Sequence, residues 1–290
     1  MSKIYRAILR RINKALNLVL KYYVKFAPLK YGLNKSEERE KKIIVSLASY
    51  NRRYSSICPA LKSLLLQTVK PDKIIVWLDE DNKKNELTPE MQRLKQFGIE
   101  YRYTDLDLKP HKKYFYVMQE FPADIIITVD DDCIYSPNLI KSLMKTYRRF
   151  PNSICARRVH KMTFDEKLAL KPYDDWIREI RCVRTPSFSL CAIGNGGILY
   201  PPALLPPQTF DLRYIQKYFI NTDDLWLKTM ELINNVKVVW APTYMITPPE
   251  TSGSQVSRLF TINQGALGNN NKSLEILQKE FPQAFEILKK

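Results

Sequence analysis

The sequence is poor in the residues that usually build metal cages and disulfide frameworks. It has 5 cysteines, no two of which form a C-x-x-C pair, and only two histidines, His111 and His160. This scattered, odd-numbered set argues against a disulfide framework and against a cysteine-rich zinc site, and it favours a reducing compartment. Two histidines also argue against a histidine-based metal cage.

Glycine is scarce as well, with 8 in 290 residues, and no G-x-G-x-x-G or G-x-x-x-x-G-K sequence follows any predicted strand. The usual dinucleotide and P-loop cradles for phosphate are therefore absent. No uncharged run approaches the roughly 18–20 apolar residues that span a bilayer. The sequence also lacks a compact apolar region followed by a small-residue cleavage site, so we expect no secretory signal.

Acidic residues are missing from positions 1–36, which hold nine of the 46 basic residues. The whole chain has a net charge of +16, and without these nine residues the net charge is +7. On a helical wheel, residues 3–26 separate into two faces, which predicts an amphipathic helix with a cationic polar face. The apolar stripe consists of Ile4, Ile8, Ile12, Leu16, Val19 and Tyr23. Two interpretations stay open: the helix lies on an anionic membrane surface, or it packs on its own domain.

From residue 42 onward, short apolar runs alternate with helical segments. Strands are predicted over 42–48, 73–78, 99–103, 124–129 and 236–240, and helices over 59–67, 88–97, 112–120, 138–148, 221–233 and 272–289. This alternation predicts an α/β fold with a mainly parallel, Rossmann-like sheet flanked by helices. In such sheets, ligands bind at the carboxyl ends of the strands.

Three adjacent carboxylates, Asp130, Asp131 and Asp132, follow the strand over 124–129. Side-chain alternation directs Asp130 and Asp132 to one side and Asp131 to the other. Hard cations such as Mg²⁺ or Mn²⁺ bind carboxylate oxygens and keep positions open for substrate phosphates. We therefore predict a divalent metal at Asp130 and Asp132, the alternative being an acidic loop that caps the next helix.

The order of these strand ends resembles the nucleotide-binding half of a GT-A fold glycosyltransferase, in particular the inverting family 2 of the bacterial surface-polysaccharide type. The first strand ends in A-S-Y-N-R at 48–52, the second in D-E-D at 79–81 and the fourth in D-D-D at 130–132. The resemblance covers residues 42–240. It implies that Asp79 binds the nucleoside, with a donor-binding set of Ser49, Tyr50, Asp79, Lys113, Asp131 and Asp132. Lys113 and Lys112 stand near where the family often has an arginine.

In the second half, Thr222-Asp223-Asp224 opens a helix, and a capping role accounts for one aspartate only. The motif is similar to the T-E-D of the same family, which makes Asp224 the expected catalytic base and places Asp223 near the acceptor. The stretch Gly194-Asn195-Gly196-Gly197 is either a loop against donor sugar or acceptor, through Gly196 and Gly197, or a turn that enters a strand. A basic strip with Arg157, Arg158, His160 and Lys161 faces the donor, the acceptor or solvent.

The resemblance implies a metal-dependent, inverting transfer from a nucleotide-sugar donor, with UDP as the default nucleotide, to a hydroxyl of a glycan or lipid-linked glycan. The expected organisation is a basic arm at 1–36, a glycosyltransferase domain at 42–270 with a nucleotide-binding half (42–133) and an acceptor half (134–270), and a C-terminal helix at 271–290. We expect a cytoplasmic protein, peripheral on the inner face of an anionic membrane.

Two other classes of function compete with this one. A nucleic-acid partner is not expected, because the excess positive charge is concentrated in the arm and carboxylates occupy the strand ends. A nucleotidyltransferase acting on sugar phosphates is the alternative enzyme. It normally needs a glycine-rich phosphate loop after the first strand, and residues 49–53 contain no glycine.

Overall fold

The structure is a computed structural model that describes residues 3–35, 38–79, 86–181, 183–243, 247–251 and 268–289, with side chains from Arg11 onward. A seven-stranded sheet runs through the molecule. The strand order is β3-β2-β1-β4-β8-β5-β9. All neighbours are parallel except β8, which runs antiparallel to β4 and β5. The predicted mainly parallel sheet is confirmed. The strands are β1 (Ile43–Ala48), β2 (Lys73–Asp79), β3 (Ile99–Thr104), β4 (Ile125–Thr128), β5 (Ser153–Ala156), β8 (Ile198–Tyr200) and β9 (Lys237–Trp240).

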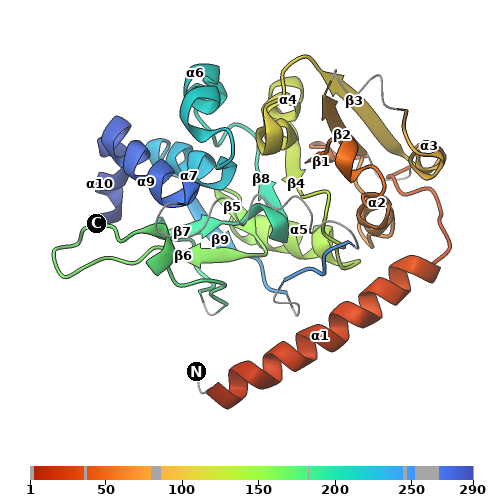
Figure 1. Cartoon of the computed structure of the whole chain (residues 1–290), viewed down its shortest axis with the longest axis horizontal. Helices are drawn as coiled ribbons and strands as arrows, with labels where there is room; N and C mark the ends of the chain where they lie inside the picture. The colour runs from red at the N-terminus through yellow and green to blue at the C-terminus, as the bar shows by residue number, and fades with distance from the viewer. Residues whose placement is uncertain are drawn as a thin grey trace.

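Helices cover both faces of this sheet (Figure 1), which explains why its central strands, such as β1 and β4, are mostly apolar. Ile44 and Ile126 share one core cluster with α4 (Lys112–Glu120), α7 (Asp223–Ile233) and α9 (Asn269–Glu280). Val45 and Ile127 point to the opposite face and pack with α2 (Cys58–Leu65), α3 (Pro89–Lys95) and α5 (Leu139–Arg149). Alternation along each strand thus divides the core into two layers.

Several elements depart from the prediction. Strand β5, the antiparallel direction of β8, and a separate two-stranded sheet of β6 (Val159–Lys161) and β7 (Leu190–Ala192) were not predicted. A short α6 (Leu212–Tyr214) precedes a π-helical turn over Ile215–Phe219. The helix predicted over 272–289 is wrong as a single element: it divides into α9 and α10 (Pro282–Glu286), because a proline favours the first turn of a new helix over the interior of an old one.

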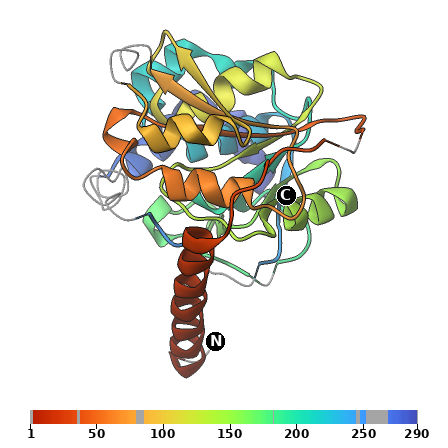
Figure 2. The same cartoon turned by 90° about the vertical axis from the view of Figure 1, so that its right-hand side faces the viewer.

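Helix α1 (Lys3–Phe26) projects from the body as a rod (Figures 1 and 2). Leu20 and Val24, near its C-terminal end, are buried against Ile134, and Lys62 Nζ donates to the carbonyl oxygen of Lys25 at 2.8 Å. The predicted apolar stripe lies on a different side of the helix: its described members are 37–65% exposed, and they are Ile12, Leu16, Val19 and Tyr23. Within the described residues, no helix combines the length and apolarity needed to cross a membrane.

Candidate active site

The carboxyl ends of β1, β2 and β4 bring three predicted motifs to one edge of the sheet. β1 pairs with both β2 and β4 in parallel register. Ser49, directly after β1, is buried and its Oγ donates to Asp131 Oδ2 at 2.6 Å. Tyr50 follows in an extended conformation at the start of a 3-10 turn over Asn51–Arg53. The shared edge follows from parallel pairing, as expected for a sheet of this class.

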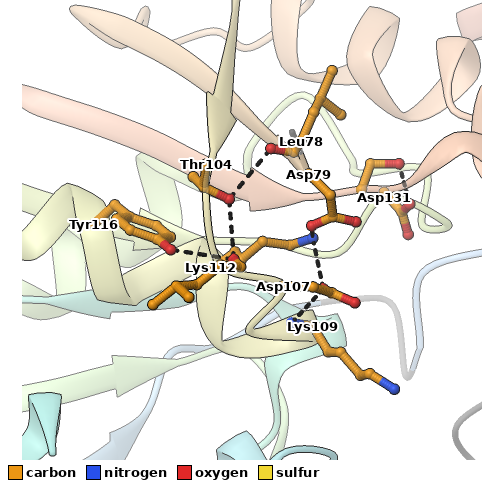
Figure 3. A network of polar contacts seen from close by, with 10 residues as sticks. Leu78, Asp79, Thr104, Asp107, Lys109, Lys112, Tyr116 and Asp131 are labelled. Atoms are coloured by element: carbon orange, nitrogen blue, oxygen red, sulfur yellow. Dashed lines mark hydrogen bonds and ion pairs between the residues drawn. The ribbon is translucent and has the colours of Figure 1, made fainter. Parts of the chain in front are cut away.

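Asp79 ends β2 and is held by a lysine from the first turn of α4. Figure 3 shows Lys112 Nζ between the carboxylates of Asp79 and Asp107, at 3.1 Å from Asp107 Oδ1. Asp107 also accepts from the backbone N–H of Lys109 at 3.0 Å. Lys112 is almost completely buried, so its charge is matched by these two carboxylates and not by solvent. The other two residues of the second motif, Glu80 and Asp81, lie outside the described residues.

The three consecutive aspartates turn to three different partners. Asp130 Oδ1 lies 2.8 Å from Lys113 Nζ, and Asp132 Oδ2 lies 3.2 Å from the Arg53 guanidinium. Asp131 points to the hydroxyl of Ser49 instead. Burial, followed by repulsion from Asp132, raises the pKa of Asp131 to about 7. Two carboxylates of the triplet are therefore directed at cations, and the middle one is directed at a neutral donor.

Lys113 joins the two halves of the chain. Its Nζ lies 2.8 Å from Asp130 Oδ1, after β4, and 2.8 Å from Asp223 Oδ2, at the start of α7. Burial alone would lower the pKa of this ammonium, but the carboxylates of Asp130, Asp223 and Asp224 raise it well above its usual value. Lys113 is therefore a permanent positive charge at the centre of a buried acidic cluster.

Asp223 and Asp224 are neighbours in sequence with opposite electrostatic surroundings. Burial alone would raise the pKa of Asp223, but the attraction of Lys113 holds it below its usual value. Burial and the charge of Asp223 raise the pKa of Asp224 well above the ordinary range. The pKa values of these two neighbouring carboxyls are thus pushed apart, as is common for carboxyl pairs that divide their roles in an active site.

A glycine is required next to this pair. The backbone N–H of Gly194 donates to Asp224 Oδ1 at 3.1 Å. A Cβ at position 194 would stand 2.7 Å from Lys113 Nζ and 3.2 Å from Asp224 Oδ1. Any larger residue would displace both charged groups, so the short turn Gly194–Gly196 lets the backbone approach the site closely.

The other two glycines of this stretch are surrounded by packing contacts. A Cβ on Gly196 would come within 2.4 Å of Arg158 Cβ. Gly197 has a φ of +88° and leads into β8, and a Cβ there would stand 2.7 Å from Leu139 Cδ1. Of the glycines in this stretch, Gly194 is the one that contacts the charged cluster.

Both histidines are buried and neutral. His111 Nε2 lies 2.7 Å from the carbonyl oxygen of Phe219, so it carries the proton, and Nδ1 accepts from the hydroxyl of Tyr114 at 2.8 Å. Burial lowers the pKa of His111 to about 4 and that of His160 to about 3. His160 Nδ1 accepts from the backbone N–H of Glu179 at 3.2 Å. Neither ring is placed to exchange protons at neutral pH.

The donor set suits a cation that is shared with a substrate. Across the described ranges, no group of three or more His, Cys, Asp or Glu side chains is arranged to hold a metal ion. Asp130 and Asp132 nevertheless offer two partly exposed carboxylates, with side chains 32% and 24% exposed. Mg²⁺-type sites commonly use one or two carboxylates and complete their coordination with substrate phosphates and water. The chemistry of this pair therefore fits such a cation.

Three contributors to the site were not singled out from the sequence: Arg53, Lys112 as the partner of Asp79, and Gly194. Arg53 stands directly after the first motif, and its neighbour Arg52 carries the same charge, so the sequence does not show which of the two enters the site. The 3-10 turn over Asn51–Arg53 buries Arg53. Likewise, the helix position decides which of Lys112 and Lys113 faces Asp79 and which faces Asp130.

Comparison with known proteins identifies the class of enzyme. A model of glycosyl transferase family 2 matches residues 44–196, more than half of the chain, which includes the first and fourth strand ends and the Gly194 turn. The chain belongs to this family and is a glycosyltransferase with a GT-A fold. No curated protein sequence matches it.

Solved structures share its fold at low sequence identity. A mannosyltransferase from Pyrobaculum calidifontis, in complex with GDP-Man and Mn²⁺, is 11% identical with a TM-score of 0.51, over 97% of this chain and 80% of the other. S. aureus TarS 1–349 with UDP-GlcNAc is 12% identical with a TM-score of 0.51, over 82% and 66%. GalNAc-T7 with UDP, GalNAc and Mn²⁺ is 11% identical with a TM-score of 0.50, over 98% and 60%.

Proposed function

We propose that the protein transfers a sugar from a nucleotide-sugar donor to a hydroxyl group of a glycan or lipid-linked glycan, with inversion at the anomeric carbon and with help from Mn²⁺ or Mg²⁺. One observation carries the proposal: Lys113 bridges Asp130 and Asp223, which places the carboxylates after β4 beside Asp224. A donor site and a proton acceptor thus lie side by side, as transfer to a hydroxyl requires.

In this proposal the first half of the chain holds the donor. Asp79 binds the nucleoside, with Ser49, Tyr50 and Asp131 lining the same edge. Asp130 and Asp132 would hold the divalent cation, which supplies positive charge to the leaving diphosphate. Lys113 supplies a second, fixed charge. These groups replace the glycine-rich phosphate cradles that the sequence lacks.

Asp224 is the base. Its carboxylate takes the proton of the acceptor hydroxyl while the hydroxyl oxygen bonds to the anomeric carbon. The bond from that carbon to the diphosphate oxygen breaks, and its electron pair leaves with the nucleoside diphosphate. Burial raises the pKa of Asp224 and so strengthens it as a base, while the positive charge of Lys113 favours the ionised form that a base requires. Asp223 stays ionised against Lys113 and orients it.

The test is to incubate the protein with a panel of nucleotide sugars and Mn²⁺ and to measure which phosphate product is released. Release of a nucleoside diphosphate is expected, EDTA should abolish it, and Mn²⁺ or Mg²⁺ should restore it. Pyrophosphate would indicate a nucleotidyltransferase, and full activity in EDTA would contradict the metal. Retention of the anomeric configuration, seen by NMR of the product, would contradict inversion.

We further propose that α1 attaches the enzyme to the cytoplasmic face of an anionic membrane, where a lipid-linked acceptor would be found. The exposed apolar stripe supplies burial in the lipid interface, and the basic residues of the polar face supply attraction to anionic headgroups. The packing of Leu20 and Val24 is compatible with this, because it uses a different side of the helix.

A further inference from the structure

A small pocket lies against the Gly194–Gly196 turn, through Gly196. Its walls also include Tyr135, Ser136, Arg157, Arg158 and Thr243. Its interior has a volume of about 20 Å³, room for about one water-sized group. The pocket therefore admits one polar atom of a larger ligand, such as a single oxygen of an anionic group that sits at its mouth.

Arg157 brings an uncompensated charge to this pocket. Its side chain is 8% exposed, and its two terminal nitrogens donate to Ser136 Oγ at 3.0 Å and to Thr243 Oγ1. Among the described residues, no carboxylate forms an ion pair with it, and its Nε is buried without a hydrogen-bond partner. Arg181 also donates to this segment, through the carbonyl oxygen of Thr243 at 2.5 Å, which brings a second positive charge close to Arg157.

The adjacent Arg158 also lines the pocket and also has a buried Nε without a hydrogen-bond partner, but it differs from Arg157 in having a carboxylate partner. Arg158 donates to Glu179 Oε1 at 2.7 Å and to Asn195 Oδ1 at 2.8 Å, so its charge is neutralised within the chain. A buried cation without such a partner is costly. The cost of burying the guanidinium is offset where an anion from outside the chain forms the ion pair.

The pocket is close to the reaction centre but separate from the donor carboxylates. Gly194 holds Asp224, and Gly196, two residues later in the same turn, lines the pocket. Two residues span at most about 7 Å. The hydroxyl of Tyr135 accepts from the backbone N–H of Asp130 and donates to the carbonyl oxygen of Asn195, which fixes the wall between the two sites.

We propose that Arg157 and Ser136 form an anion subsite that binds a phosphate or carboxylate group of the acceptor, beside the hydroxyl that is glycosylated. This proposal rests on the proposed function. Arginine binds planar and tetrahedral oxyanions through paired N–H donors. Ser136 accepts from the guanidinium, so its own O–H can donate to the same anion.

The test is isothermal titration of the full chain with inorganic phosphate and, separately, with glucuronate, at constant ionic strength. Wild type should bind one of the two, and the one that binds identifies the source of the anion. Arg157→Gln should weaken that binding at least tenfold, whereas Arg148→Gln, an exposed arginine of α5, should leave it unchanged. If Arg157→Gln does not fold, Ser136→Ala replaces it and should weaken binding at least threefold.

A second titration is made with Mn²⁺ and with UDP or GDP, whichever binds, already present. Phosphate or glucuronate should still bind, because the subsite belongs to the acceptor. The proposal is overturned if wild type binds neither anion, if Arg157→Gln binds as tightly as wild type, or if the nucleotide displaces the anion. Anion binding without release of nucleoside diphosphate from any donor would contradict the proposed function and leave the subsite standing.

Discussion

At the carboxyl edge of the sheet, charged side chains are buried, whereas on helix α1 apolar side chains are exposed. Lys112 and Lys113 are only 2% and 4% exposed, and each is an ion-pair partner of two carboxylates. Val19 on α1 is 65% exposed, although a valine stabilises a fold when it is buried. Each region departs from the general rule for its residue type.

The two regions differ in what offsets the buried charge in the first and the exposed apolar surface in the second. Buried charges at the sheet edge are matched within the chain, by partners from both of its halves, so the site is organised before a substrate arrives. The apolar stripe of α1 is not covered by the described residues, so its compensation has to come from outside them. Substitutions in the first region should therefore change chemistry and folding, and those in the second should change attachment alone.

The largest effect is expected from Asp224→Asn. An amide cannot accept the proton of the acceptor hydroxyl, so kcat should fall by about 10²-fold or more, with donor affinity nearly unchanged. Steady-state kinetics of nucleoside diphosphate release in the presence of acceptor measures this. Glu166→Gln, at an exposed carboxylate outside the site, is the control. Turnover like wild type in the Asp224 variant would move the base elsewhere, with Asp223, Asp174 and Asp175 as the next candidates.

Lys113→Met tests whether the buried charges depend on one another. Without the ammonium, Asp130 and Asp223 lose their ion-pair partner in a buried setting, so the free energy of unfolding should fall by about 3 kcal/mol at neutral pH. Urea denaturation measures the change. Lys141→Met, on the exposed face of α5, should cost less than about 0.5 kcal/mol. Equal stabilities of the two variants would contradict the central role of Lys113.

We expect the buried His111 to make the folded protein less stable in mild acid. The pKa of His111 is about 4 in the folded protein, below the unfolded value of about 6.5, so the unfolded chain binds more protons as the pH falls. His111 alone should lower the free energy of unfolding by about 2 kcal/mol between pH 7 and pH 5. Denaturation at the two pH values, compared between wild type and His111→Gln, checks this. An identical pH dependence would contradict it.

The smallest effect on catalysis is expected from α1. Leu16→Glu combined with Val19→Glu places two charges on the apolar stripe, so binding to anionic vesicles should weaken at least tenfold while kcat on a soluble acceptor stays unchanged. Co-sedimentation measures the binding. The control pair, Leu168→Glu with Ile177→Glu, makes the same change at exposed apolar residues of the body and should bind like wild type. Equal binding by both pairs would remove the role of α1.

Most of the sheet could be predicted from local pattern. The strands β1, β2 and β4 are mostly apolar because both of their faces are covered, and such runs are visible without any tertiary information. The acidic triplet follows the predicted strand over 124–129, so the sequence also predicted its place at the ligand-binding edge of the sheet. β8 could not be assigned with the same certainty: it has three residues, and its antiparallel insertion depends on pairing with strands far away in the chain.

Residue types and their order along the chain were enough to determine the fold class, the enzyme family suggested by the motifs and the amphipathic character of α1, because these depend on local periodicity and on spacing. Only the tertiary structure decided which charges meet. Lys113 lies 17 residues before Asp130 and far from Asp223 in sequence, and their meeting depends on how α4 and α7 pack on one face of the sheet. Packing also gave Arg158 a carboxylate partner and, among the residues that the structure describes, gave none to Arg157, because burial and pairing are properties of the space around a side chain and not of its place in the chain.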